Sequence, residues 1–295
     1  MKKWLLILAC LSLFASDEEA PAPSLWDFHP IHGGGNLIAI GKADVDVKHG
    51  PHEGELTFNK ANAFLYMLVP INNESYFFPR VEWNGFTMDW NKNPKFHETR
   101  FQFVQFSLTF YTIALEKWKW IARTEYNIDL KHFSKAKTYG LFSALLWGTH
   151  EINPKWHYHV GALGYSGYEG QEVYPIIGLD YAPTEKWMFQ LVFPMSYSVE
   201  YNINKEWRLS LKARPLKERF RTGKQEPQPR SIFCYSSTGA EFNVHYEKFL
   251  RLEIEAYAGY NFGGTFYIKD ETGHNSLYTN IHGAPYAGAS LNWGF

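Results

Sequence analysis

Residues 286–295 read YAGASLNWGF. Successive side chains of a β-strand point to opposite faces, so alternate positions of this stretch form two sets. One set is apolar and ends in two aromatics: Ala287, Ala289, Leu291, Trp293 and Phe295. The other set is mostly small or polar. Because about ten residues let a tilted strand cross the apolar core of a bilayer, the stretch predicts a membrane-crossing strand.

The aromatic ending is similar to that of chains folded into the bacterial outer membrane. Their assembly machinery reads the final strand, so the resemblance implies that Leu291, Trp293 and Phe295 form an assembly signal. It also implies the barrel-assembly machinery and outer-membrane lipid as partners. A soluble edge strand that stops at an aromatic residue is the alternative, and the rest of the chain has to decide between the two.

The composition fits a barrel that faces lipid. The 295 residues are 18% aromatic and 45% hydrophobic, and the mean hydropathy is -0.35. No apolar run reaches the roughly 18 residues that a membrane helix needs. A membrane barrel distributes its apolar residues by alternation, so a negative average is compatible with it. The formal net charge of -1 gives no electrostatic case for nucleic acid.

The first residues predict a leader. Lys2 and Lys3 precede an apolar run over residues 4–15, which polar and acidic residues then end. This pattern is typical of a secretory signal peptide, which we predict over residues 1–16. A lipidated Cys10 is the alternative, because residues 7–10 also resemble a weak lipoprotein cleavage box.

Residues 17–35 are acidic, then rich in proline, and end in three glycines. They predict a periplasmic lead-in without regular structure, followed by a barrel over residues 36–295. With Cys10 in the leader, Cys234 is the one thiol of the mature chain, and no internal disulfide is expected.

Alternation at period two recurs along the mature chain, most clearly in residues 118–130, 197–203, 207–214 and 250–262. In residues 207–214, tryptophan, leucine and alanine alternate with arginine, serine and lysine. In a membrane barrel the lipid-facing side chains are apolar, aromatics mark the interfaces and the lumen is polar. The pattern therefore predicts an all-β fold, an antiparallel up-and-down transmembrane β-barrel.

Short charged turns that lead into an aromatic residue also recur. They are Glu116-Lys117-Trp118, Pro154-Lys155-Trp156, Glu185-Lys186-Trp187, Lys205-Glu206-Trp207 and Glu247-Lys248-Phe249, with residues 72–75 before Tyr76. A tight polar turn feeding an interfacial aromatic suits a membrane rim, which we interpret as the periplasmic one. The opposite connections are longer and more polar: residues 48–54, 91–99, 131–138, 167–172, 222–231 and 269–276.

These connections predict the number of strands. Six short turns and seven outer connections give about fourteen strands with both termini periplasmic. The seventh outer connection has to be a tight bend near Pro194 and Met195, which splits residues 187–203 into two short strands. Twelve strands is the fallback.

The charged faces of the predicted strands supply candidates for lining the lumen. They are Lys119, Arg123, Glu125, Asp129, Glu200, Arg208, Lys212, Arg214, Glu241, His245, Arg251, Glu253 and Glu255. Lining a wet channel, they would set its electrostatics; paired across a closed lumen, they would form a polar plug. Because both signs occur, we expect weak ion selectivity and favour the channel.

Histidines give the only hint of a metal site. His157 and His159 lie two residues apart on a predicted strand and so point the same way. No third ligand sits at a telling spacing, so a lumenal or interfacial role is favoured. The same interpretation holds for the histidines in loop-like sequence, His29, His32, His49 and His52.

Catalytic motifs are weak. Gly161, Gly164 and Gly167 imitate a phosphate-binding loop, but no helix pattern follows them. The chain has neither a Gly-x-Ser-x-Gly elbow nor a His-Glu-x-x-His motif. We predict no catalytic residue, cofactor or metal, and therefore not an enzyme.

A family resemblance lies in the C-terminal third. Residues 187–194 follow Trp-x-x-x-x-x-x-Pro, and residues 197–207 follow Tyr-x-x-x-Tyr-x-Ile-x-x-x-Trp. This resembles a widespread family of uncharacterised bacterial outer-membrane β-barrel proteins, known only as a domain of unknown function. The resemblance implies the fold and the bacterial cell outer membrane as location, and it carries over no functional site.

The sequence thus predicts an outer-membrane β-barrel that is a passive channel or binding barrel for small solutes. One alternative is a barrel enzyme that modifies outer-membrane lipid with a serine and a histidine at the rim. Another is a structural or adhesion barrel that acts through its long loops. A soluble periplasmic β-protein is the remaining one.

Overall fold

The structure is a computed structural model that describes residues 31–47, 52–91, 97–167, 170–248, 252–270, 272, 274 and 277–294. The predicted signal peptide at residues 1–16, most of the lead-in, Arg251 and Phe295 lie outside the described residues. So do Cys10, His29 and His49. None of the described helices is long and apolar enough to cross a membrane.

Strands make up nearly all of the described chain. The first eight are β1 (Ile31–Val47), β2 (His52–Met67), β3 (Val69–Asn72), β4 (Ser75–Trp90), β5 (Arg100–Leu115), β6 (Trp118–Asp129), β7 (Gly140–Asn153) and β8 (Trp156–Gly167). The others are β9 (Gly170–Thr184), β10 (Trp187–Phe193), β11 (Ser196–Asn202), β12 (Trp207–Arg221), β13 (Ile232–Lys248), β14 (Leu252–Lys269), β15 (Leu277–Ile281) and β16 (Ala284–Gly294). Two short helices, η2 (Leu130–Lys135) and α3 (Ala136–Tyr139), join β6 to β7.

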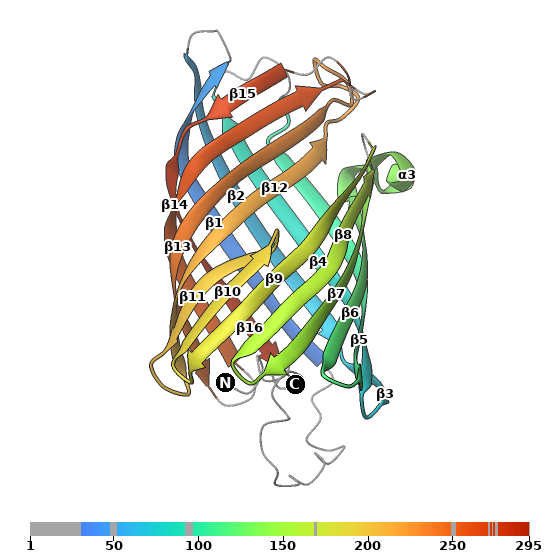
Figure 1. The fold of residues 1–295 in the computed structure, drawn as a ribbon. Coiled ribbons are helices and arrows are strands. Elements are labelled where there is room, and N and C mark those ends of the chain that lie inside the picture. Colours follow the sequence, from blue (N-terminus) through green and yellow to red (C-terminus); the bar gives the residue numbers. More distant parts are fainter. Residues whose placement is uncertain are drawn as a thin grey trace.

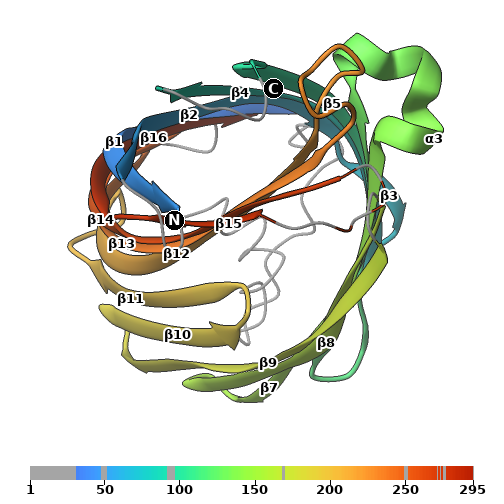
Figure 2. The same ribbon diagram turned by 90° about the horizontal axis from the view of Figure 1, so that it is seen from above.

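The strands close into one antiparallel barrel (Figures 1 and 2). Apart from the short strands β3 and β15, each pairs with its neighbours in chain order, and β16 closes the ring by pairing with both β14 and β1. β3 pairs with β4 beside the end of β2, and β15 and β16 share the place between β14 and β1. The barrel therefore has 14 strands, which confirms the predicted fold and the preferred strand number.

The connections follow the predicted asymmetry. At one end, which we call the short-turn end, tight turns join the strands at residues 73–74, 116–117, 154–155 and 185–186. The start of β1 lies at this end beside the finish of β16, because His32 pairs with Gly294. The opposite end is the long-loop end. Pro194 and Met195 form the predicted tight bend between β10 and β11 part-way towards it, because Phe193 pairs with Ile177 in the middle of β9.

The lead-in is shorter than predicted. β1 begins at Ile31, so the part of the lead-in from residue 31 to residue 35 belongs to the barrel. The glycines there make room for aromatic neighbours: a Cβ on Gly33 would lie 2.8 Å from Cζ2 of Trp293, and one on Gly34 would lie 2.6 Å from Cζ of Phe64. The three glycines therefore belong to a strand in which neighbouring side chains pack closely, and not to a lead-in without regular structure.

The outer surface of the barrel is apolar. Many of its exposed large side chains lie on the predicted lipid-facing positions, among them Leu211, Phe242, Ile254, Tyr260 and Phe262. At the short-turn end, tryptophans stack on tyrosines of neighbouring strands, with centroids 4.1 Å apart for Trp156 and Tyr181. Trp207 and Tyr246 lie 4.7 Å apart at the same end. The predicted rim of turn-flanking aromatics therefore exists.

The interior divides into two halves. Towards the long-loop end it holds a buried apolar core, formed by Ile38, Ile40, Ala43, Val45, Leu56, Phe58, Phe86, Met88, Trp90, Phe101, Phe103, Leu216, Phe220, Phe233, Tyr235, Tyr257, Phe266, Ile268, Ile281, Ala284 and Tyr286. The expectation that apolar side chains face outward along the whole of each strand is wrong for this half. Here both faces are apolar, because opposite walls of the barrel pack against each other.

β14 shows the change along one strand. Towards the short-turn end its inward positions carry Glu253 and Glu255, and towards the long-loop end they carry Phe266 and Ile268. Gly263, at φ +88°, lies between the two parts. The strand therefore contributes to a polar interior and to an apolar core without leaving the sheet.

Candidate functional site

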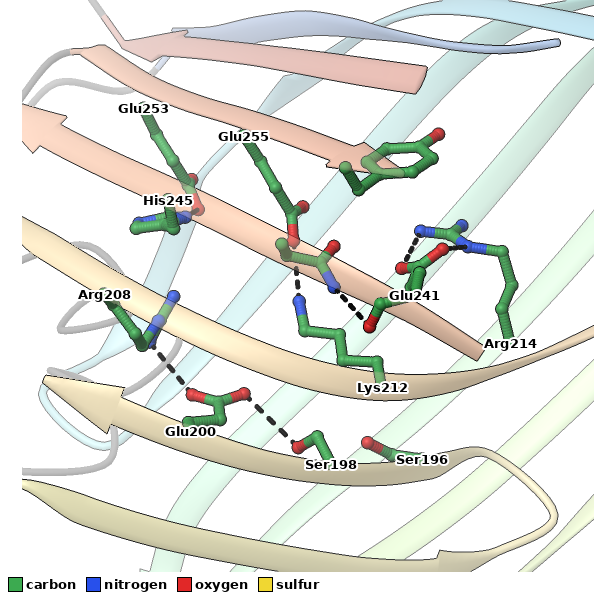
Figure 3. Close-up of polar contacts among 12 residues, drawn as sticks. Ser196, Ser198, Glu200, Arg208, Lys212, Arg214, Glu241, His245, Glu253 and Glu255 are labelled. Carbon is green, nitrogen blue, oxygen red and sulfur yellow. Dashed lines mark hydrogen bonds and ion pairs between the residues drawn. The ribbon is translucent and has the colours of Figure 1, made fainter. Parts of the chain in front are cut away.

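The polar half of the interior is the candidate site. Inward positions of β11, β12, β13 and β14 place most of the predicted lumen-lining residues side by side (Figure 3). Their apolar partners at alternate positions face outward, as the alternation requires. Lys119, Asp129, Glu200, Glu241 and His245 are buried.

Glu241 lies at the centre of this network. It is 1% exposed and accepts two hydrogen bonds from Arg214, at 2.5 Å from Nε and 2.6 Å from Nη2. The hydroxyl of Tyr286 donates to the same carboxylate at 3.0 Å. The Arg214 guanidinium also lies over the ring of Tyr257, 4.5 Å from its centroid. A two-point guanidinium–carboxylate contact of this kind fixes both side chains.

A second ion pair runs beside the first. Lys212 Nζ donates to Glu255 Oε1 at 2.7 Å. Asn243, with its amide nitrogen turned towards the carboxylates, donates to Glu255 at 2.9 Å and to Glu241 at 3.1 Å. The amide therefore joins the two pairs into one network.

Glu200 and His245 continue the network on either side. Glu200, 2% exposed, lies 3.4 Å from Nη1 of Arg208 and accepts from the hydroxyl of Ser198 at 3.4 Å (Figure 3). His245 Nδ1 lies 3.5 Å from the carboxylate of Glu253. Carboxylates thus meet cations or histidine along the whole row, which keeps opposite charges together in a shielded interior.

The remaining predicted residues lie elsewhere in the interior. Arg123 and Glu125 pair with each other at 3.0 Å on β6. Lys119 lies 4.0 Å from Glu151. Asp129 has a different task, because its carboxylate accepts from the backbone nitrogen of Lys131 at 2.8 Å and so caps η2.

Glu82 and Asp180 are among the polar groups that sequence reasoning missed. Glu82 accepts from Arg80 at 2.5 Å and from Asn62 at 2.9 Å. Asp180 lies 3.0 Å from Nε2 of His159. Each of these acidic residues lies between two bulky apolar or aromatic residues. The alternation was therefore present at both places, but a single acidic residue did not predict a charged face.

His159 invites a catalytic interpretation, because its ring lies between a carboxylate and a hydroxyl. Nδ1 is 3.0 Å from the Thr149 hydroxyl, and Nε2 faces Asp180. The indole nitrogen of Trp147 donates to the same Nδ1 at 3.0 Å. Since that lone pair already accepts the indole hydrogen, Nδ1 cannot take a proton from Thr149, and the group is a hydrogen-bonded lock between strands.

The histidines do not form a metal centre in the described part of the chain. No group of three or more potential ligands gathers there. His157, which was paired with His159 as a possible site, lies 4.0 Å from Glu151. His32 lies in β1, where it stacks on Tyr66 with centroids 4.8 Å apart, rather than in a loop.

Comparisons with known proteins find a family model and relatives that match most of the chain. A family model described as a domain of unknown function (DUF6268) matches residues 88–294. A Chlamydia pneumoniae protein described as uncharacterised is 21% identical over 267 residues, covering 85% of this chain and 84% of the relative. One from Chlamydia trachomatis is 19% identical over 255 residues, covering 81% and 80%.

A solved structure shares the architecture. The crystal structure of an outer membrane channel from Pseudomonas putida F1 matches with a TM-score of 0.50 and 9% identity. The match covers 94% of this chain and 100% of that chain. At that identity the likeness extends to the barrel fold.

Proposed function

The chain belongs to the DUF6268 family, a domain of unknown function, and we propose that it is a solute-binding barrel of the bacterial outer membrane with low conductance at rest. The family membership confirms the resemblance carried by residues 187–207. The proposal assigns binding and passage of small solutes to the polar half, and no catalysis.

The exterior supports the location. A band of exposed apolar side chains surrounds the barrel, and aromatics gather at the short-turn end. This distribution suits a lipid-facing surface with an interfacial aromatic girdle. On this proposal the short-turn end faces the periplasm, and residues 291–294 belong to the strand that the assembly machinery would read.

One observation carries the function: the interior is polar in one half and closed by apolar packing in the other. Phe220 contacts Phe86 and Phe101 from the opposite wall, with centroids 4.9 and 4.6 Å apart. A path along the axis would have to part these rings. In the polar half, paired charges of both signs give no strong preference for cations or anions.

Planar-bilayer recording of the refolded protein tests this function. We expect small, infrequent conductance steps and nearly equal permeabilities for potassium and chloride. A large, permanently open pore would contradict it. Subcellular fractionation with a heat-modifiability gel tests the location separately, and extraction without detergent would refute the membrane assignment.

A further inference from the structure

The barrel wall is interrupted above β10 and β11, which have 7 residues each (Figure 1). β9 pairs with β10 only over residues 177–184, and β12 pairs with β11 only over residues 208–213. Beyond these limits, the facing edges of β9 and β12 pair with no strand within the described residues. We call this interruption, between residues 170–176 and residues 214–220, the seam.

The seam lies at the level of lipid. Seven residues that rise about 3.3 Å each, tilted by roughly 45°, reach about 16 Å. The apolar band of an outer-membrane barrel is about 25 Å tall. The wall formed by β10 and β11 therefore ends inside the bilayer, where open strand edges need polar partners.

Side chains bridge the seam. Glu172 of β9 accepts from Lys217 Nζ of β12 at 2.9 Å and also bonds Arg219. The Tyr174 hydroxyl accepts from Lys217 at 2.8 Å and donates to Glu172 at 2.5 Å. Two cations thus share one carboxylate, and the bridge carries a net charge of one positive unit.

A cavity of about 190 Å³ lies behind the bridge. Glu172, Lys217 and Arg219 line its seam side. Aromatic rings line much of the rest: Phe86, Phe103, Phe142, Tyr165 and Phe220. The lysine on its far side, Lys60, is already paired with Glu218 at 2.7 Å. Glu125 also lines the cavity and is paired with Arg123 at 3.0 Å, so the positive charge that these two pairs leave uncompensated is at the seam.

We propose that the seam is a lateral binding site for an anionic single-chain amphiphile of the fatty-acid class. Its carboxylate takes the place of Glu172 between Lys217 and Arg219. At about 30 Å³ per water, the cavity holds about six waters, so it accepts a head group and the first carbons only. The rest of the chain lies outward along Val173 and Ile177, which are 72% and 65% exposed beside the seam.

This inference rests on the proposed membrane location and names the ligand class of the barrel. It also explains how a barrel closed along its axis can still exchange a ligand, because the seam opens sideways. Lys217 and Arg219 bind the head group, and Glu172 is the internal competitor that keeps the seam shut when no ligand is present.

Binding of radiolabelled dodecanoate to the full protein in phosphatidylcholine nanodiscs tests the site. Because a hydrogen bond to a charged group is worth about a factor of ten or more, we expect K217Q and R219Q each to weaken binding roughly tenfold. E172Q should tighten it by several-fold, since the competing charge is gone. The matched control is E55Q, which alters a similarly short ion pair, Lys42–Glu55 at 2.8 Å, between two strands that pair directly with each other, β1 and β2. It should change nothing.

Other outcomes overturn the proposal. Equal affinities in all variants, or equal binding of dodecyltrimethylammonium, would remove the anionic site. If R219Q does not fold, K217Q and E172Q still test the site. A loss of dodecanoate affinity in E172Q would contradict the role of Glu172 as a competitor. Loss of dodecanoate binding in phosphatidylglycerol nanodiscs would overturn the proposal of a free ligand, because it would show that an anionic membrane lipid occupies the site. Conductance is recorded separately, so a failed channel proposal is distinguishable from a failed binding site.

Discussion

The two halves of the interior are built from the same strands but are held together in different ways. In the long-loop half, contacts run between opposite walls: Phe58 of β2 stacks on Tyr235 of β13 at 5.0 Å, and Trp90 of β4 meets Phe266 of β14 at 4.8 Å. In the polar half, the ion pairs of β12, β13 and β14 join strands of one wall.

Because of these different contacts, the long-loop half is the blocked part of the interior. Cross-wall aromatic packing collapses the long-loop half, and the loop at residues 222–231 adds to this by reaching Glu98, which accepts from the backbone of Gly223 at 3.2 Å. Pairs within one wall leave the two walls of the polar half independent of each other. On the proposed function, the apolar core therefore controls passage along the axis, and the polar network controls what binds below it.

The largest expected effect comes from the core. Phe220 is 1% exposed, and F220A should lower the free energy of unfolding by about 3–5 kcal/mol, because it removes a buried ring and leaves a cavity. It should also raise the conductance in planar bilayers. Guanidinium unfolding in lipid vesicles measures the first effect.

The control for this variant is F242A, which truncates a phenylalanine that is exposed on the outer face. It should cost much less and leave conductance unchanged. Equal losses of unfolding free energy in the two variants would show that the core is no better packed than the surface. The long-loop half would then not be held together by its aromatic core.

The next effect concerns the outer face. Leu211 is 58% exposed on β12, and L211R should destabilise the protein by about 2–4 kcal/mol in lipid, since an arginine there has to enter the apolar layer. L211M is the control and should be nearly neutral. Unfolding in vesicles gives both values, and a neutral L211R would place this face in water.

A smaller effect is expected in the polar half. E241Q leaves Arg214 facing a neutral amide and should cost about 2 kcal/mol, because a charged, buried hydrogen-bonding partner is weakened. Adding R214M in the same chain should recover much of this loss, as the unpaired charge is then removed. A double variant that is as unstable as the sum of the single ones would show that the two residues act independently.

Much of the fold could be predicted because turn chemistry and alternation are local. The charged turn before Trp207 and the bend at Pro194 give the strand ends, and residues 207–214 give the correct inward and outward faces. The shared interior could not be predicted. β12 changes its inward side chains from Lys212 and Arg214 to Leu216 and Phe220 without ending, so an apolar side chain alone does not tell which face it occupies.

The seam had no local signal at all. Glu172 was placed at the end of an outer connection, and its partners Lys217 and Arg219 lie 45 and 47 positions later in the chain. Only the premature end of β10 and β11 brings β9 and β12 face to face. Of the candidate site, the individual charged residues were therefore predictable, while their pairing within one wall and across the seam was not.

The smallest expected effect tests the polar half at His159. W147F replaces the indole by a smaller aromatic ring and removes the donor at 3.0 Å from Nδ1. The lost hydrogen bond should cost about 1 kcal/mol, its typical net value. Nitrogen NMR of the histidine should show an unprotonated Nδ1 in the wild type, since that atom accepts the hydrogen. A protonated Nδ1 would reverse the assignment, with Thr149 as the acceptor and the Nε2 lone pair facing Asp180. The contacts of Nδ1 with Trp147 and Thr149 would then have to be assigned the other way round.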